Sequence, residues 1–245
     1  PSNYLKRFHG PSSNFVDTTF VNRSTLYFRF SCPEKDDRKI GLDIISGKGC
    51  LSIDTKNTIT ITQRSSFPTV CAVPDDVCLS SGKWYYEITL LDAGLAQCGW
   101  GDVEFQPSSE DGDGTGDDEH SWSYDGHRTS KWHNGSTTWG KSWSSGQVVG
   151  CAVDIDNRKM YFSLDGDFST PMGEAFSNFN FRGGLRPAVS SNYPCQYRFN
   201  FGDQTKFKYS PPSSDYQAVA LAVGNDVLST RSYGYRFQVR SYPGL

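Results

Sequence analysis

Two aspartates, Asp154 and Asp156, stand two positions apart, a spacing that could support acid–base chemistry. On a β-strand Asp154 and Asp156 would point the same way, because side chains alternate between the two faces. Paired carboxyl groups roughly 5–9 Å apart hydrolyse glycosides. This pair, however, ends an apolar run beside Asn157 and Arg158, and no third acidic residue follows at short spacing. We therefore expect both aspartates to support a turn.

A second candidate is the acidic stretch DGDGTG at 111–116, which begins like a calcium-binding EF-hand loop with glycine at position six. Such a loop needs a bidentate glutamate at position twelve, where this chain has Trp122. Position eight is Asp118 instead of an apolar residue. The pattern favours a solvated, mobile acidic insertion over residues 110–119, dispensable for folding, and leaves weak cation binding open.

Three histidines, His120, His127 and His133, share one stretch, but no cysteine lies between residues 99 and 150 to complete a zinc site. No nucleophile motif or phosphate-binding loop is present. The sequence therefore predicts no enzyme activity, no cofactor and no metal.

The net charge is −3, and residues 110–119 carry six acidic side chains and no basic one. The remainder has 24 basic and 21 acidic residues, a balance of +3, which is too small to indicate a nucleic-acid footprint. No run approaches 18 apolar residues and no signal peptide is visible, so we expect no membrane segment. The seven cysteines, an odd number without zinc spacing, are typical of buried thiols in a cytoplasmic protein.

Short runs rich in aromatic and β-branched residues, separated by Gly, Asp, Asn or Pro, predict an all-β fold. Asp165-Gly166 favours the positive φ angles of a tight turn. Apolar spacing allows one short helix near 215–223. The expected strands are 26–30, 58–62, 84–91, 95–101, 148–155, 159–164, 185–190, 195–201 and 235–239.

Between residues 80 and 210 the chain resembles the SPRY domain family. Three positions depart from the family pattern: Gln147 replaces a usual Asp, Asp165 replaces a usual Asn, and the 167–172 loop is longer. The resemblance rests on motifs in family order: GKWYYE (82–87), QCGW (97–100), SYDG (123–126), KWHN (131–134), WGKSW (139–143), GQVVGCAVD (146–154), YFSLDG (161–166), GEAF (173–176), LRPAVS (185–190) and FNFG (199–202).

The resemblance implies a bent sandwich of two antiparallel sheets that binds proteins through loops at one edge. We expect the SPRY core at 66–212, an N-terminal extension at 1–65 that packs on or precedes the sandwich, and a C-terminal extension at 213–245 with a short helix and strand. The two terminal segments are expected to lie close together and extend the sandwich.

The expected ligand edge comprises loops 92–96, 127–143 and 191–196. Trp84, Trp100 and Trp122 are assigned to the core. For Trp132, Trp139 and Trp143, packing is favoured over exposure at the binding edge. The predicted partner-binding residues are Asp92, Ala93, Gly94, Trp139, Ser191, Asn192 and Tyr193.

The sequence thus predicts a non-catalytic, monomeric interaction module of a larger protein. It would bind a protein or peptide, with no nucleic acid and no membrane, and by analogy could recruit substrates for a ubiquitin ligase. Two alternatives stay open: a structural domain that packs within its own parent protein, and a carbohydrate-binding sandwich.

Overall fold

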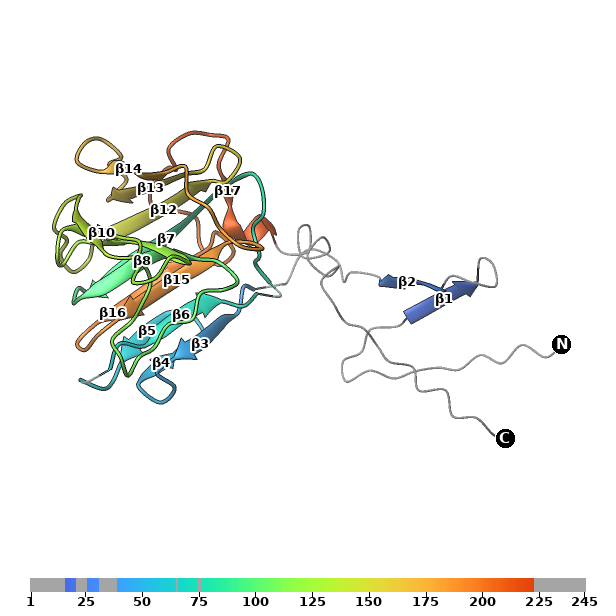
Figure 1. Cartoon of the computed structure of the whole chain (residues 1–245), viewed down its shortest axis with the longest axis horizontal. Helices are drawn as coiled ribbons and strands as arrows, with labels where there is room; N and C mark the ends of the chain where they lie inside the picture. Colours follow the sequence, from blue (N-terminus) through green and yellow to red (C-terminus); the bar gives the residue numbers. More distant parts are fainter. Residues whose placement is uncertain (1–15, 21–25, 31–38, 65, 75, 223–245) are drawn as a thin grey trace. The chain divides into compact units, whose positions relative to one another are not determined.

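The computed structural model describes residues 16–20, 26–30, 39–64, 66–74 and 76–222 (Figure 1). It divides the chain into two compact units, residues 1–38 and 39–245. In the first unit, β1 (Val16–Phe20) and β2 (Leu26–Phe30) form an antiparallel pair in which Val16 lies opposite Phe30. The strand predicted at 26–30 is therefore confirmed.

The second unit contains two sheets. The seven-stranded sheet has the order β11 (Ser136–Thr138), β10 (Ser130–Trp132), β9 (Ser121–Asp125), β8 (Ala96–Gly101), β15 (Arg186–Ser191), β6 (Thr69–Ala72), β3 (Leu42–Ser46). The eight-stranded sheet has the order β14 (Gly173–Ser177), β13 (Lys159–Leu164), β12 (Val148–Asp154), β7 (Lys83–Asp92), β16 (Gln196–Asn200), β5 (Thr58–Ile61), β4 (Leu51–Ile53), with β17 (Gln217–Ala218) paired beside β7.

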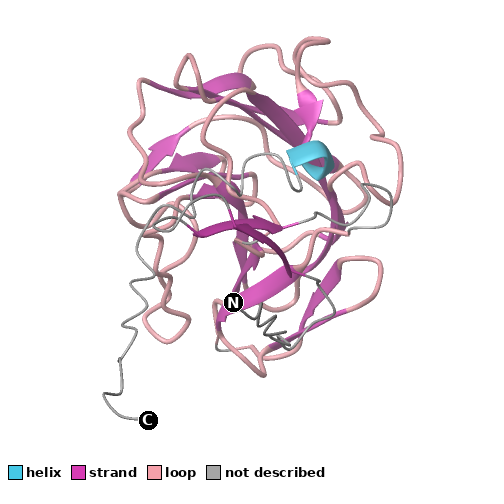
Figure 2. Ribbon diagram, turned by 90° about the vertical axis from the view of Figure 1, so that its right-hand side faces the viewer, coloured by secondary structure: helices cyan, strands magenta, loops and turns pink. Residues whose placement is uncertain are grey.

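The predicted all-β sandwich of two antiparallel sheets is confirmed, and neither sheet closes on itself. Every pairing is antiparallel except β17 with β7. Figure 2 shows the strands in magenta and the short 3-10 turn at 219–222 in cyan. Within the described residues, no helix is long and apolar enough to cross a membrane.

The sandwich extends beyond residues 66–212, because β3, β4 and β5 precede that range and pair with β6 and β16. The predicted division of the chain into a core at 66–212 and two extensions, 1–65 and 213–245, stays a prediction. The predicted strand at 235–239 lies outside the described residues.

Alternation of side chains along the strands builds the core between the sheets. Tyr86 of β7 and Trp100 of β8 meet edge to face, with ring centroids 4.9 Å apart and both rings buried. The predicted core positions of Trp84, Trp100 and Trp122 are confirmed. The turn after β13 is also as predicted, since Asp165 and Gly166 have φ angles of 51° and 79°.

The predicted helix near 215–223 is only partly correct. Gln217 and Ala218 form β17, opposite Trp84 and Tyr85, and a single 3-10 turn, η1 (Val219–Ala222), follows. Val219 and Ala222 are its buried residues, so the buried spacing is three, the period of a 3-10 helix.

The outer face of the seven-stranded sheet is covered by residues 102–120, which we call the cover loop. Cys71 and Ala188 alternate with main-core residues on their strands, so they point to this outer face. There they form a small buried cluster with Phe105 of the cover loop.

On the eight-stranded sheet, Glu87 holds a C-terminal segment across the outer face. Its buried carboxylate accepts the backbone N–H groups of Lys208 at 2.8 Å and Tyr209 at 2.7 Å. Phe207 packs edge to face on Tyr85, with centroids 4.8 Å apart. The cover loop and residues 207–209 therefore each cover part of an outer sheet face.

Candidate functional site

Three loops meet at one edge of the sandwich, where β7 turns into β8 and β15 turns into β16. The Asn192 N–H donates to the Leu95 carbonyl at 3.0 Å, and the Ala93 N–H donates to Ser145 Oγ at 2.9 Å. The Trp143 indole N–H reaches the Gly94 carbonyl at 3.4 Å. We call residues 92–95, 139–145 and 191–195 the loop rim.

Gly94 is required by the close approach of two of these loops. A Cβ at this position would lie 2.7 Å from the Pro194 carbonyl oxygen, which is closer than real Cβ contacts. The prediction that the small residues Ala93 and Gly94 admit a ligand backbone is untested. In this structure, the chain's own Pro194 occupies the space beside Gly94.

Tyr193 is the exposed aromatic residue of the loop rim. Its exposed fraction is 36%, and only Val103 and Leu221 join it as exposed large hydrophobic residues in the described part of the chain. The Arg64 guanidinium carbon lies 4.9 Å from the centroid of its ring. Because Arg64 follows β5, which pairs with β16 just after Tyr193, the strand pairing brings cation and ring together.

Other predicted site residues differ in their accessibility. Asp92 is exposed at the end of β7, and Asn192 is half-buried. Ser191 is fully buried, so its side chain faces the interior and offers nothing to a partner in this conformation.

The tryptophans of the 139–145 loop pack on the core through Tyr124. Its ring is edge-on to Trp139, at 5.5 Å, and to Trp143, at 5.1 Å. Trp143 is buried, as favoured from the sequence, while Trp139 and Trp132 are half-buried. Trp143 contacts the turn at Gly94, and the predicted role of Trp139 in binding a partner stays a prediction.

Sequence reasoning missed Arg64 and Ser145, which contact predicted site residues. A signal for Arg64 existed, since it stands just after the clearly alternating strand 58–62. Ser145 had no comparable signal, because its role depends on a hydrogen bond across 52 residues of sequence.

The aspartate pair supports turns, as expected. Asp154 accepts the Asn157 N–H at 3.0 Å and lies 3.3 Å from Lys83 Nζ, and Asp156 accepts the Gly82 N–H at 3.0 Å. Burial alone would raise the pKa of Asp154, but hydrogen bonds from Asn157 and Lys83 bring it below its usual value. Asp154 is therefore not suited to donate a proton.

The three histidines do not share a site. His120 Nδ1 lies 3.1 Å from Asp102, while His133 Nδ1 lies 2.9 Å from the Ser121 carbonyl oxygen and the ring stacks on Trp122. His127 is exposed. Among the described residues, no three His, Cys, Asp or Glu side chains are grouped to hold a metal ion.

Buried thiols of the sandwich are also unsuited to nucleophilic chemistry. Cys71, Cys98, Cys151 and Cys195 are buried and form no disulfide. Burial raises the pKa of Cys71 to about 12 and that of Cys195, beneath the loop rim, to about 11. A thiolate at neutral pH is therefore disfavoured at both positions.

The prediction of a solvated acidic insertion at 110–119 is wrong for its second half. Residues 110–113 are exposed, but Thr115 is fully buried and its N–H donates to Ser190 Oγ at 2.8 Å. Asp117 accepts the Gly114 N–H at 2.7 Å and Gln97 Nε2 at 3.1 Å. Since the acidic side chain bonds inward, the segment packs despite having no large apolar residue.

Comparison with known proteins places these features in a family. The family model described as "SPRY domain" matches residues 83–204 of this chain. The chain is 34% identical over 137 residues to "E3 ubiquitin-protein ligase RKP" of Arabidopsis thaliana, covering 55% of this chain and 10% of that protein. It is 27% identical over 159 residues to "ATP-dependent RNA helicase DDX1" of Xenopus laevis, covering 64% of this chain and 20% of that protein.

A third relative, "Probable ATP-dependent RNA helicase ddx1" of Dictyostelium discoideum, is 30% identical over 135 residues, covering 55% of this chain and 16% of that protein. The chain thus corresponds to no more than a fifth of the length of these relatives. The matched range runs from the start of β7 to just beyond β16, and includes the whole loop rim. Residues 83–204 therefore form a SPRY domain, and the chain belongs to the SPRY domain family.

Proposed function

We propose that the loop rim binds a segment of another protein and that this chain catalyses no reaction of its own. SPRY domains are generally protein-interaction modules. The observation that carries the proposal is Tyr193, an exposed aromatic ring under the Arg64 guanidinium on loops that hydrogen-bond to one another. An aromatic anchor that is already held in place loses little side-chain freedom on binding.

The proposed partner offers an apolar side chain to Tyr193 and hydrogen-bonding groups to Asp92 and Asn192. Asp92 is exposed and makes no ion pair within the described residues, so it is available to a base or a backbone N–H. The net charge of −3 does not favour nucleic acid as the partner.

At the level of the whole protein, we propose that the chain is a monomeric recognition part of a larger cytoplasmic protein. The buried thiols agree with a reducing compartment. Similarity to a ubiquitin ligase supports a role in recruiting substrates for ubiquitination. In this proposal, residues 66–212 hold the recognition core and the flanking segments extend it.

The test is to capture partners from cytosolic extract with the full chain, map the bound segment, and measure its affinity for Tyr193→Ala. Loss of a central aromatic anchor typically costs about 2 kcal/mol, or roughly 30-fold in Kd. Asp92→Ala should weaken the same segment by a smaller factor.

The matched control is Val103→Ala, which removes an exposed apolar side chain outside the loop rim. It should leave the affinity unchanged. If the mapped segment binds the Tyr193→Ala and Asp92→Ala chains as tightly as the unaltered chain, the binding surface lies elsewhere.

A further inference from the structure

The two sheets end together at β3 and β4, which are the last strands on the same side of the sandwich. Strand β3 pairs with β6 on one edge, and no other described strand pairs with its second edge. Its outward backbone N–H and C=O groups therefore form a row that another strand could extend.

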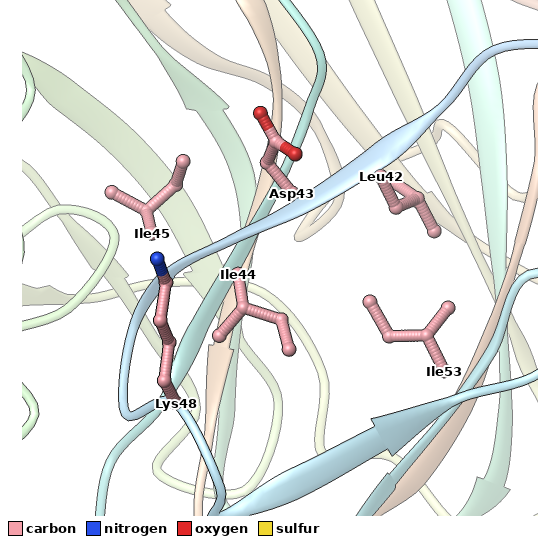
Figure 3. A pocket seen from close by; sticks show the side chains of 6 residues that line it. All are labelled: Leu42, Asp43, Ile44, Ile45, Lys48 and Ile53. Carbon is pink, nitrogen blue, oxygen red and sulfur yellow. The ribbon is translucent and has the colours of Figure 1, made fainter.

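A depression of about 670 Å³ opens between these two strands, with four aliphatic side chains in its lining beside the charged Asp43 and Lys48. Figure 3 shows Leu42 and Ile44 on the side of β3 that faces Ile53 of β4, while Asp43 lies on the other side. All three aliphatic side chains are only half-buried, although they pack against the main core. The end of the sandwich is therefore incompletely covered by the described residues.

The opposite end of the sandwich is closed. There Lys131 of β10 donates its ammonium to the Ala175 carbonyl of β14 at 2.5 Å, which joins the two sheets. Phe176 packs under the same ammonium group, 5.2 Å from it. The depression at the β3/β4 end therefore has no counterpart in the contact between β10 and β14.

We propose that residues 235–239 of this chain, outside the described part, add as a strand to the free edge of β3. The segment reads YRFQV, so Tyr235, Phe237 and Val239 alternate with polar residues. On a strand, these three side chains share one face and would cover the half-buried Leu42, Ile44 and Ile53.

The chain between the two elements is long enough for this pairing. Twelve residues, 223–234, separate the end of η1 from Tyr235. Fully extended, they reach at most ~40 Å, comparable to the width of a domain of this size. The stretch holds Gly224, Asn225 and Gly234, which favour turns.

Charge also favours this occupant. Arg236 and Arg240 flank the apolar positions on the opposite face of the segment. Asp43, on the corresponding face of β3, is exposed and makes no ion pair with the described residues. Opposite charges on neighbouring strands stabilise their pairing.

The test is backbone amide exchange, followed by mass spectrometry, on the full chain and two variants. Phe237→Asp puts a charge on the apolar face, and the matched control Gln238→Asp puts the same charge on the polar face of the same segment. We expect exchange in 42–46 to be at least tenfold faster in Phe237→Asp and nearly unchanged in Gln238→Asp. Exchange in β8 should be equal in all three.

Three results would overturn the proposal: equal exchange in 42–46 in all three chains, equal acceleration by both variants, or protection that rises with protein concentration as the chain dimerises. The last would assign the edge to a second copy. If Phe237→Asp also accelerates β8, the milder pair Phe237→Ser and Gln238→Ser is compared in the same way.

Discussion

The cover loop and the loop rim differ in the direction their polar groups face. In the cover loop, Asp102 and Asp117 bond to groups of the protein itself, and Asp102 is fully buried. In the loop rim, Asp92 and Tyr193 stand exposed at the ends of strands, and the loops are joined by a backbone hydrogen bond and by the side chains of Ser145 and Trp143.

This difference shows that a polar, glycine-rich composition does not by itself make a loop solvated. Phe105 anchors the first part of the cover loop by an apolar contact, whereas residues 114–117 offset the entropy of their ordering through buried hydrogen bonds. The loop rim is joined by its backbone, Ser145 and Trp143, which leaves the side chains of Asp92 and Tyr193 available to a partner. Substitutions in the cover loop should therefore change stability, and those in the loop rim should change binding.

The largest effect is expected from Gly114→Val in the cover loop. A Cβ there would lie 2.4 Å from Phe67 Cε1 and 2.5 Å from Ser190 Cβ, so the loop must lift from the sheet. We expect a loss of about 3 kcal/mol in unfolding free energy, measured by urea denaturation. The control Gly112→Ala has open space around it and only the strain of a positive φ, so it should lose about 1 kcal/mol.

A smaller loss is expected when the Asp117 carboxylate is removed. Asp117→Ala leaves the Gly114 N–H and the Gln97 amide without their acceptor, which typically costs about 2 kcal/mol in unfolding free energy. Replacing the exposed residues 110–113 by Gly and Ser should change it by less than about 0.5 kcal/mol. Equal losses from both changes would remove the distinction between the packed and solvated halves.

His120 should give the cover loop a weak pH dependence. A hydrogen bond that His120 donates to the Asp102 carboxylate raises the pKa of His120, with Asp118 and Glu104 adding to the shift, while partial burial opposes it. Its stabilising contribution is therefore complete below the unfolded pKa of about 6.5 and is lost as pH rises through the higher folded pKa.

Compared with His120→Gln, the unaltered chain should lose stability between pH 6 and 8, by less than about 1 kcal/mol. Thermal melts of both chains across this range provide the measurement. A difference that grows with pH would contradict the assigned sign.

The smallest stability effect is expected in the loop rim. Tyr193→Ala removes an exposed ring, so the melting temperature should stay within about 2 °C of the unaltered chain. A larger fall would show that the ring supports the 191–195 loop and would blur the contrast with the cover loop.

Sequence reasoning identified the strands that show alternating side chains or a turn motif within their own few residues. Thr58–Ile61 alternates cleanly, and Lys159–Leu164 ends at a recognisable Asp-Gly turn. By contrast, Ser121–Asp125 was not predicted, although all five residues are buried. Its serines are satisfied by the cover loop and its neighbours, a partnership that no window of sequence around the strand reveals.

For the candidate site, the family resemblance located the loops but not the contacts within them. Trp139 and Trp143 have the same residue type and lie in one Gly/Ser-rich stretch, and only the fold determines which of them reaches Gly94. Ser191 looked equivalent to its neighbours Asn192 and Tyr193, but it still belongs to strand β15 and faces inward.

The segment that Glu87 binds shows that the end of the family match and the end of the packed domain are different positions. The family match ends at residue 204, whereas the N–H groups that satisfy this buried carboxylate come from Lys208 and Tyr209. A polypeptide ended at 204 would keep every matched residue yet lose both donors and expose Tyr85. The range that the family match covers is therefore shorter than the unit that packs together, and limited proteolysis would locate the end of the packed unit.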